Sequence, residues 1–148
     1  ESRHVQLAAA QLAVPPRPVP IWIGAFKPRM LAVAGRHGDG WLPTNAYLDL
    51  ADVPEMQRRI DAAATAAGRD PARIRRVLNV MGVISDQVPE RNDQRLNGSA
   101  RFWVETLHDY RDRLGFDSIV FWPVHRDVRA QVRLFFTQVR PHLGPADG

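Results

Sequence analysis

Apolar residues follow two alternating patterns along the chain. Short apolar runs at 21–23, 41–43, 76–84 and 118–122 predict buried strands, because a run without polar alternation is typical of a strand covered on both faces. The segments between these runs place apolar residues three and four positions apart, which predicts amphipathic helices. The order is therefore strand and helix, four times over. Strands that alternate with helices in this way are expected to pair in parallel through crossover connections.

The four expected helices begin and end at specific residues. Pro28 suits the first turn of the first helix, Pro54 opens the second, and Gly68 ends it. Ser99 is a natural N-cap for the third helix, which Gly115 stops. The expected apolar faces of the last three helices are Met56, Ile60, Ala63 and Ala67; Trp103, Leu107, Tyr110 and Leu114; and Val128, Val132, Phe135, Val139 and Leu143.

The two ends of this pattern indicate a domain boundary. Residues 3–13 are rich in Ala and Leu and predict a short helix, which the prolines within 15–18 then end. We therefore expect residues 1–18 to form an N-terminal helix and a Pro-rich linker, and residues 19–148 to form the folded domain. Residues 86–98 are polar and contain Pro, Asn and Gly, so they are expected to form a loop.

Two α/β architectures accommodate this order of elements. One is an open, doubly wound parallel sheet, and the other is part of a (β/α)8 barrel. Four segments of the sequence bear on this choice. The first is Pro20–Ala25 followed by Pro28, and the second is Ala34–Arg36 together with Gly38–Trp41. The third is Ala67–Pro71, and the fourth is Leu114–Pro123. In this order and spacing they resemble the luciferase-like monooxygenase family, which includes relatives of bacterial luciferase and F420-dependent oxidoreductases.

The resemblance implies both a fold and an activity. The family folds as a TIM barrel of typically about 250 residues or more. The four units here would match its last four strands, so the expected fold is α/β, the C-terminal half of a TIM barrel. The resemblance also implies part of a flavin- or F420-dependent oxidoreductase or monooxygenase acting on a small organic substrate. Nineteen arginines against one lysine suggest a GC-rich genome, which mildly favours F420 over FMN. The alternative is a non-catalytic, truncated half-barrel that self-associates.

The turn after the first expected strand is the candidate cofactor site. A strand-to-helix turn presents backbone N–H groups and the positive end of a helix to an anion. The resemblance places this loop near the phosphate of FMN or F420. A phenylalanine and a lysine stand where the family often has a pair of glycines. The predicted cofactor-binding residues are Gly24, Ala25, Phe26 and Lys27.

The loops that follow the other strands are the candidate substrate site, because the active sites of TIM barrels lie at the carboxyl ends of the strands. The third strand is followed by Ser85 and Asp86. The predicted substrate-binding residues are Thr44, Asn45, Trp122, His125 and Arg126. Asp39 precedes a strand, so it is expected at the opposite end of the barrel, where residues serve stability. The pattern assigns no catalytic residue.

Composition narrows the possible partners. Without cysteine there are no disulfides or thiolate ligands, and the five histidines lack metal-ligand spacing, so no metal is expected. The net charge is +4, but acids are interspersed among the arginines, so nucleic-acid binding is not expected. No apolar run reaches the about 18 residues of a membrane span, so no transmembrane helix is expected. The absence of cysteine fits the cytoplasmic location that we expect. A half-barrel leaves two strand edges exposed, which predicts a homodimer or association with a missing N-terminal half.

Overall fold

The computed structural model describes residues 17–144, so the helix expected over 3–13 lies outside the described residues. Four parallel strands form the main sheet: β1 (Trp22–Ile23), β2 (Gly40–Trp41), β3 (Arg75–Ile84) and β6 (Ser118–Pro123). Each is followed by one of four α-helices: α1 (Pro28–His37), α2 (Val53–Ala66), α3 (Ala100–Asp112) and α4 (Val128–Leu134). The predicted order of strands and helices is confirmed. No helix within residues 17–144 is long and apolar enough to cross a membrane.

Several helix ends also match the expectation. The hydroxyl of Ser99 accepts a hydrogen bond from the N–H of Phe102 and so caps α3. Gly68, directly after the C-cap of α2, has a φ of 71°, a left-handed conformation that glycine adopts without strain. Short 3-10 turns occupy Asn45–Tyr47, Leu50–Asp52, Pro71–Arg73 and Arg140–His142, and a π-helical turn continues α4 over Phe135–Val139.

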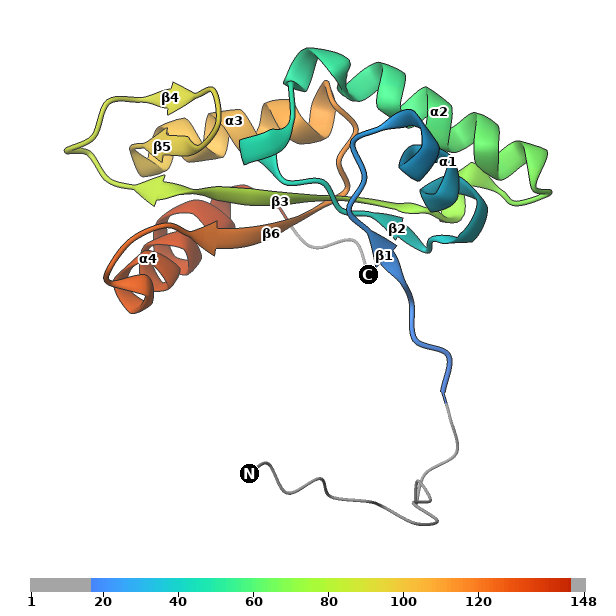
Figure 1. Ribbon diagram of the computed structural model, residues 1–148. Helices are drawn as coiled ribbons and strands as arrows, with labels where there is room; N and C mark the ends of the chain where they lie inside the picture. Colours follow the sequence, from blue (N-terminus) through green and yellow to red (C-terminus); the bar gives the residue numbers. More distant parts are fainter. Residues whose placement is uncertain (1–16, 145–148) are drawn as a thin grey trace, which may run out of the picture.

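Strand β3 is the longest strand and joins the two sides of the sheet (Figure 1). Strand β2 pairs with its first two residues, and β6 pairs with Val77–Gly82. The N–H of Asn79 donates to the Pro43 carbonyl, whereas the Gly82 carbonyl accepts from Val124. Odd-numbered residues of β3 therefore bond toward β2, and even-numbered residues bond toward β6.

The side chains of β3 alternate between two environments, because successive residues of a strand point to opposite faces. Leu78, Val80 and Ile84 are almost completely buried in the core beneath the helices. Trp41 of β2 lies in the same core and stacks on Phe116, with ring centroids 5.7 Å apart. Figure 1 shows α1, α2 and α3 along one side of β3, with α4 beside β6. The opposite face, here called the inner face, carries Asn79, Met81, Val120 and Trp122.

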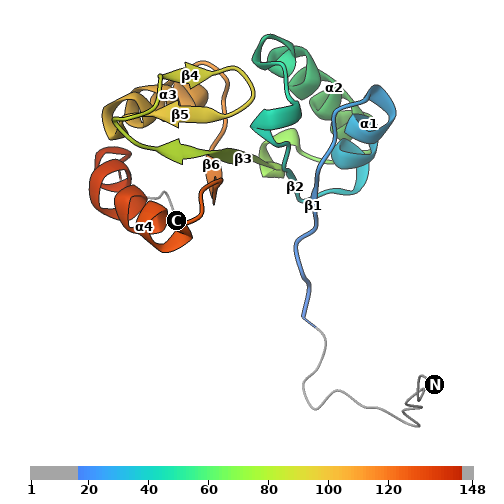
Figure 2. The same cartoon turned by 60° about the vertical axis from the view of Figure 1, so that its left-hand side comes forward.

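The prediction of a loop over residues 86–98 is wrong, because this segment contains a β-hairpin. Strand β4 (Arg91–Asn92) pairs antiparallel with β5 (Leu96–Gly98), and β5 pairs in parallel with the end of β3. Figure 2 shows the hairpin beside α3. A Cβ on Gly82 would lie 1.8 Å from the Leu96 carbonyl oxygen, so glycine is what permits the two backbones to meet. Leu96 is fully buried and anchors an otherwise polar segment to the core.

The second strand comprises Gly40–Trp41 rather than the expected 41–43. The next residues stay beside β3, since the Pro43 carbonyl accepts from the N–H of Asn79 and Thr44 forms an isolated parallel bridge with Asn79. Proline has no N–H to donate, so the regular ladder stops before it.

The last helix is turned about its axis relative to the prediction. Phe135 and Val139 are buried as expected, but Val128 and Val132 are exposed. The polar residue Gln131 is buried instead. The apolar spacing therefore predicted the wrong buried face for the first part of this helix. Gln131 faces inward because its side-chain amide hydrogen-bonds the backbone of Ile84 at the end of β3. The expected continuous helix also becomes a π-helical turn after Leu134.

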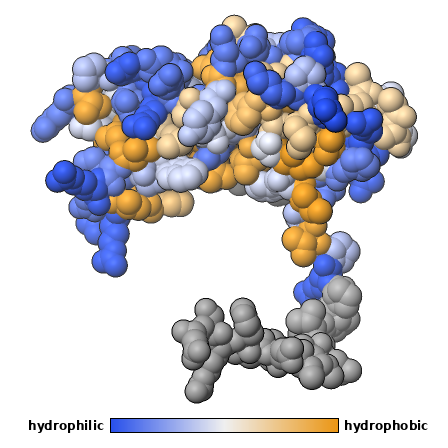
Figure 3. Space-filling view, in the orientation of Figure 1, coloured by the Kyte–Doolittle hydropathy of each residue, from blue (hydrophilic) through white to orange (hydrophobic). Residues whose placement is uncertain are grey.

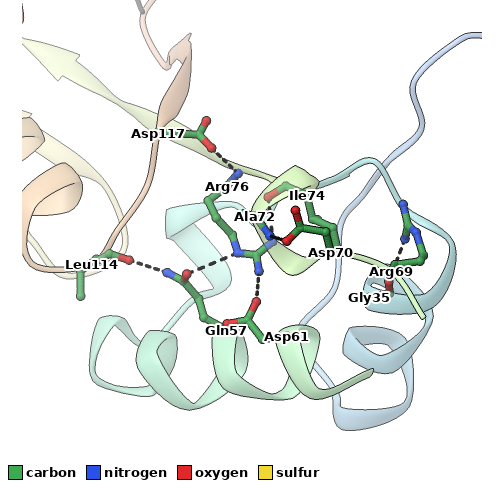
Figure 4. Close-up of polar contacts among 10 residues, drawn as sticks. All are labelled: Gly35, Gln57, Asp61, Arg69, Asp70, Ala72, Ile74, Arg76, Leu114 and Asp117. Atoms are coloured by element: carbon green, nitrogen blue, oxygen red, sulfur yellow. Dashed lines mark hydrogen bonds and ion pairs between the residues drawn. The ribbon is translucent and has the colours of Figure 1, made fainter. Parts of the chain in front are cut away.

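Arg76 anchors the start of β3 to α2 through a guanidinium group that is 9% exposed (Figure 4). Its Nη2 pairs with the Asp61 carboxylate, its Nε donates to Gln57 Oε1 over 3.3 Å, and its Nη1 donates to the Ile74 carbonyl over 3.0 Å. Its backbone N–H donates to Asp117 Oδ2 over 2.8 Å. A buried charge is tolerated when it is paired and hydrogen-bonded, so these partners hold the arginine within an apolar strand.

Candidate functional site

The loop between β1 and α1 is positioned by contacts with β2. The indole N–H of Trp41 donates to the Ala25 carbonyl over 2.9 Å, and both residues are buried. A Cβ on Gly24 would lie only 3.3 Å from the Leu42 carbonyl oxygen, so a larger residue would press on the chain after β2. The loop therefore has a defined backbone path that leaves Lys27 exposed at the start of α1.

Phe26 and Lys27 have different surroundings. Phe26 is half-buried, packs against the core, and meets Tyr47 edge-on with ring centroids 6.4 Å apart. Lys27 is the N-cap residue of α1, makes no capping hydrogen bond through its side chain, and precedes a first turn without acidic residues. An anion at this helix end would meet the positive end of the helix dipole and the exposed cationic side chain of Lys27.

Thr44 and Asn45, after β2, both face β3. The Asn45 amide bonds both backbone groups of Met81: Nδ2 donates to its carbonyl over 3.1 Å, and Oδ1 accepts its N–H over 2.9 Å. The Thr44 hydroxyl oxygen accepts from Asn79 Nδ2 over 3.1 Å. Within residues 17–144 the Thr44 hydroxyl hydrogen has no acceptor, so Thr44 can still donate a hydrogen bond. The Asn45 amide, in contrast, is already hydrogen-bonded to the backbone of Met81.

Asn79 is a polar residue of the inner face that the sequence analysis did not single out. It lies in the middle of β3 and is 8% exposed. Its Oδ1 is buried and has no hydrogen-bond partner in the part of the chain that the structure describes. An unpaired buried acceptor costs about 1–3 kcal/mol. An asparagine inside the apolar run 76–84 was the available sequence signal.

Ser85, Asp86 and His125 line a groove of about 680 Å3 at the carboxyl ends of β3 and β6. His125 Nδ1 accepts the N–H of Asp127 over 3.1 Å, so the neutral imidazole carries its proton on Nε2. The hydroxyl oxygen of Ser85 accepts the N–H of Gln87 over 3.1 Å. A carboxylate, a hydroxyl and an imidazole together can bind a polar organic molecule and exchange a proton with it.

Trp122 and Arg126 follow the same end of β6. Trp122 is 54% exposed on the inner face, in register with Met81 of β3. Arg126 is exposed and forms no ion pair with the residues of 17–144. Thr44 and Asn45 thus meet β3 at Asn79 and Met81, and Ser85, Asp86 and His125 share one groove. The roles assigned to these residues stay predictions.

Asp39 lies at the amino-terminal end of the sheet, away from these loops. Its Oδ2 accepts the N–H of Ile21 over 2.9 Å, and its Oδ1 lies 3.6 Å from Arg69 Nη2. The N–H of Asp39 also donates to the Ile21 carbonyl. These contacts tie the start of β1 to the start of β2, which is a structural role.

Comparison with known proteins settles the family. The sequence model of the luciferase-like monooxygenase family matches residues 1–131, which is most of the chain. The chain belongs to this family. The resemblance carried by the strand and turn motifs is therefore confirmed, and the match covers the β1–α1 loop and the loops after β2, β3 and β6.

Curated relatives of this luciferase-like chain come from mycobacteria. Phthiodiolone/phenolphthiodiolone dimycocerosates ketoreductase of Mycobacterium sp. (strain JLS) is 39% identical over 82 residues, which are 51% of this chain and 20% of that protein. F420-dependent hydroxymycolic acid dehydrogenase of Mycobacterium tuberculosis (strain ATCC 25618 / H37Rv) is 35% identical over 72 residues, 49% of this chain and 19% of that protein. The matched part therefore spans about a fifth of the length of these relatives.

Solved structures of the family show the same fold. An F420-dependent secondary alcohol dehydrogenase, in complex with an F420-acetone adduct, superposes with a TM-score of 0.73 and 12% identity over 88% of this chain and 51% of its own. The coenzyme F420-dependent tetrahydromethanopterin reductase of Methanopyrus kandleri superposes with a TM-score of 0.69 and 17% identity, over 85% of this chain and 51% of its own. Riboflavin lyase with modified FMN superposes with a TM-score of 0.67 and 12% identity, over 82% of this chain and 42% of its own. The luciferase-like chain thus has the α/β fold of about half of a TIM barrel, not that of an open doubly wound sheet.

Proposed function

We propose that this chain supplies the phosphate-binding loop and part of the substrate pocket of an F420-dependent oxidoreductase. The observation that carries the proposal is the similarity, over about half of this chain, to an F420-dependent dehydrogenase and to a ketoreductase of the same family. FMN is the alternative cofactor, because a structure with modified FMN shares the fold. The matched part is a fifth of those relatives, so the reaction itself is proposed for a complete barrel to which this chain contributes.

The β1–α1 loop fits the phosphate group that F420 and FMN both carry. Gly24 keeps the backbone close to β2, and the first turn of α1 has no acidic residue that would repel an anion. Lys27 and Arg29 are exposed on either side of Pro28 and add positive charge. Backbone N–H groups at a helix N-terminus and a lysine amine are the usual ligands of a phosphate. These residues would hold the cofactor by its phosphate.

The inner face and the groove beside it fit a cofactor ring and a small alcohol or ketone. The Thr44 hydroxyl has a hydrogen left to donate, and Trp122 offers an exposed flat apolar surface. His125 presents an Nε2–H donor when neutral. F420, when bound, supplies a ring carbon that exchanges hydride with the substrate. The chain's own residues would orient the substrate oxygen and hold a proton at His125 Nε2. We further propose a cytoplasmic location, with which a cysteine-free sequence is compatible.

Titration of F420 and FMN against this chain, followed by the fluorescence of each cofactor, tests the proposal. Riboflavin and the deazaflavin without its phosphate-bearing side chain are titrated in parallel. We expect the phosphorylated form of at least one cofactor to bind more tightly than its counterpart without phosphate. Lys27→Ala is expected to weaken the phosphorylated form about tenfold, through the loss of one charge-assisted contact, and to leave its counterpart unchanged.

Arg73→Ala is the matched control, because Arg73 is an exposed cation in the turn before β3, at the other end of the sheet. It removes the same charge and is expected to leave binding unchanged. Equal weakening by Lys27→Ala and Arg73→Ala would show a general charge effect and reject the loop as the phosphate site. Absence of binding by every cofactor would reject cofactor binding by this chain.

A further inference from the structure

The Asn79 side chain lies on the inner face between two in-register neighbours. Asn79 forms a parallel bridge with Thr44 on one side and pairs with Val120 of β6 on the other. In-register residues of neighbouring strands point to the same face of a sheet, so these three side chains share the inner face. In Figure 3 this face is the lower side of the body, which is hollowed between α4 and the segment that leads into β1. Of the two neighbours, only Thr44 has a side chain that forms hydrogen bonds.

The Asn79 amide is only half satisfied. Its Nδ2 donates to Thr44 Oγ1 over 3.1 Å, whereas its Oδ1 is buried and has no partner within residues 17–144. The side chain is enclosed by residues of this chain, since Asn79 is 8% exposed. An apolar side chain at this position would leave no buried acceptor unpaired, so stability does not explain an asparagine here. The hydrogen bond to Thr44 is what an apolar side chain could not supply.

That hydrogen bond determines what the Thr44 hydroxyl can do. A threonine hydroxyl carries one hydrogen and two acceptor lone pairs. The Asn79 N–H occupies one lone pair, so the hydroxyl hydrogen must point away from Asn79. Thr44 is half-buried, and this hydrogen has no acceptor in the part of the chain that the structure describes. A carbonyl oxygen, which accepts hydrogen bonds and has no hydrogen to donate, is the group that fits this donor.

We propose that Asn79 is a positioning residue, which orients the Thr44 hydroxyl to donate a hydrogen bond to a carbonyl oxygen of the bound molecule. This inference rests on the proposed function, in which Thr44 faces the cofactor ring and the substrate. Two carbonyls share the required chemistry, one on the ring of F420 or FMN and one on a ketone substrate. Asn79 acts through Thr44 and needs no contact with either of them.

A double-mutant cycle in the whole chain tests this positioning role. The affinities for FMN, for F420 and for acetone added to the cofactor-bound chain are measured in each variant. For the ligand that carries the carbonyl, Thr44→Val is expected to weaken binding about tenfold, and Asn79→Leu about threefold. Because Asn79 acts through Thr44, Asn79→Leu is expected to cause no further loss in the Thr44→Val background.

Infrared difference spectra identify which carbonyl accepts the hydrogen bond. A hydrogen-bonded C=O group absorbs at lower frequency than a free one. Thr44→Val and Asn79→Leu are therefore expected to shift one carbonyl band upward, either of the cofactor ring or of isotope-labelled acetone. A shift of the ring band assigns the donor to the cofactor, and a shift of the acetone band assigns it to the substrate. The affinity for that same ligand is the one expected to fall.

Asn92→Leu is the matched control, because Asn92 lies in the β4–β5 hairpin and its Oδ1 accepts a hydrogen bond from the Tyr110 hydroxyl. It is expected to lower the urea midpoint and to leave every affinity unchanged. Asn79→Leu is expected to show the opposite result, with a midpoint that is kept or raised and a weakened affinity. Asn79→Val repeats the measurement with a smaller side chain.

Three results would overturn the positioning role in a chain that binds its cofactor. They are a lowered urea midpoint in both Asn79 variants without a loss of affinity, losses in the cycle that simply add, and carbonyl bands that do not move. A wild-type chain that binds neither cofactor gives a different result. It rejects the proposed function, and the positioning role of Asn79 is rejected with it.

Discussion

The side-chain amide of Gln131 hydrogen-bonds both backbone groups of Ile84, the last residue of β3. Oε1 accepts the Ile84 N–H over 2.8 Å, and Nε2 donates to the Ile84 carbonyl over 3.0 Å. Because β6 ends at Pro123, this amide takes the place of the next strand residue. On the other edge of β3 the amide of Asn45 bonds Met81 in the same two-bond manner. The buried side-chain amides of Gln131 and Asn45 thus complete the backbone hydrogen bonding of β3 on its two edges.

Gln131→Leu is expected to lower the free energy of unfolding by about 2–4 kcal/mol, because it leaves the buried N–H and C=O of Ile84 without partners. Urea denaturation measures the loss. The control is Gln138→Leu, an exposed position in the following π-helical turn, which is expected to change stability by less than about 0.5 kcal/mol. A similar small loss in both variants would show that water replaces the Gln131 amide.

Arg76 and Arg75 are consecutive residues in opposite environments, and their alanine variants are expected to differ. Arg76→Ala removes a buried guanidinium and leaves Asp61, Gln57 and the Ile74 carbonyl without it, so a loss of about 2–4 kcal/mol is expected. Arg75 is half-exposed in its pair with Asp117, so Arg75→Ala is expected to cost at most about 1 kcal/mol. Thermal unfolding of the two variants compares them directly. Equal losses would contradict the assignment of Arg76 as the anchor of β3.

Gly82→Ala is expected to displace the β4–β5 hairpin. The added Cβ would lie 1.8 Å from the Leu96 carbonyl oxygen and 2.7 Å from the Trp103 ring, so the two backbones must separate. We expect a loss of about 3 kcal/mol and faster amide exchange in Leu96–Gly98. Gly68→Ala is the matched control, since no atom lies within 4 Å of its added Cβ. There only the left-handed backbone is strained, at a cost of about 1–2 kcal/mol, and hairpin exchange should not change.

The stability of the chain is expected to fall at alkaline pH through Tyr110. Burial raises the pKa of the Tyr110 hydroxyl above its usual range, although its hydrogen bond to Asn92 lowers it in part. The folded state therefore keeps this proton when the unfolded state releases it, so the free energy of unfolding declines as pH rises above about 10. Below that pH the residue adds no pH dependence. Urea midpoints across this range measure the slope.

Tyr110→Phe is expected to make that alkaline decline shallower, at a cost of about 1 kcal/mol at neutral pH from the lost hydrogen bond to Asn92. Tyr47→Phe is the control, because Tyr47 is 75% exposed. It should leave the slope as it is in the wild type. If the decline persists unchanged in Tyr110→Phe, another group causes it.

The candidate site was only partly predictable. Lys27 and Thr44 lie in the loops after β1 and β2, as the order of elements predicted, and their roles as binding residues stay predictions. Asn45 was predicted by the same reasoning, but its amide hydrogen-bonds the backbone of Met81, a residue 36 positions away. Asn79 was missed because the run 76–84 was interpreted as a whole, although Asn79 within it leaves a buried Oδ1 without a hydrogen-bond partner among the described residues.

The sequence by itself determined the order of strands and helices, several helix ends and the family. These depend on local spacing, on single residues such as Ser99 and Gly68, and on motifs that are contiguous in the chain. Only the tertiary structure decided that residues 91–98 form a hairpin and that Gln131 rather than Val128 faces inward. The reason is that a strand edge needs hydrogen-bond partners wherever its neighbour stops. Where β6 stops beside β3 is a relationship between distant segments, which no local pattern contains.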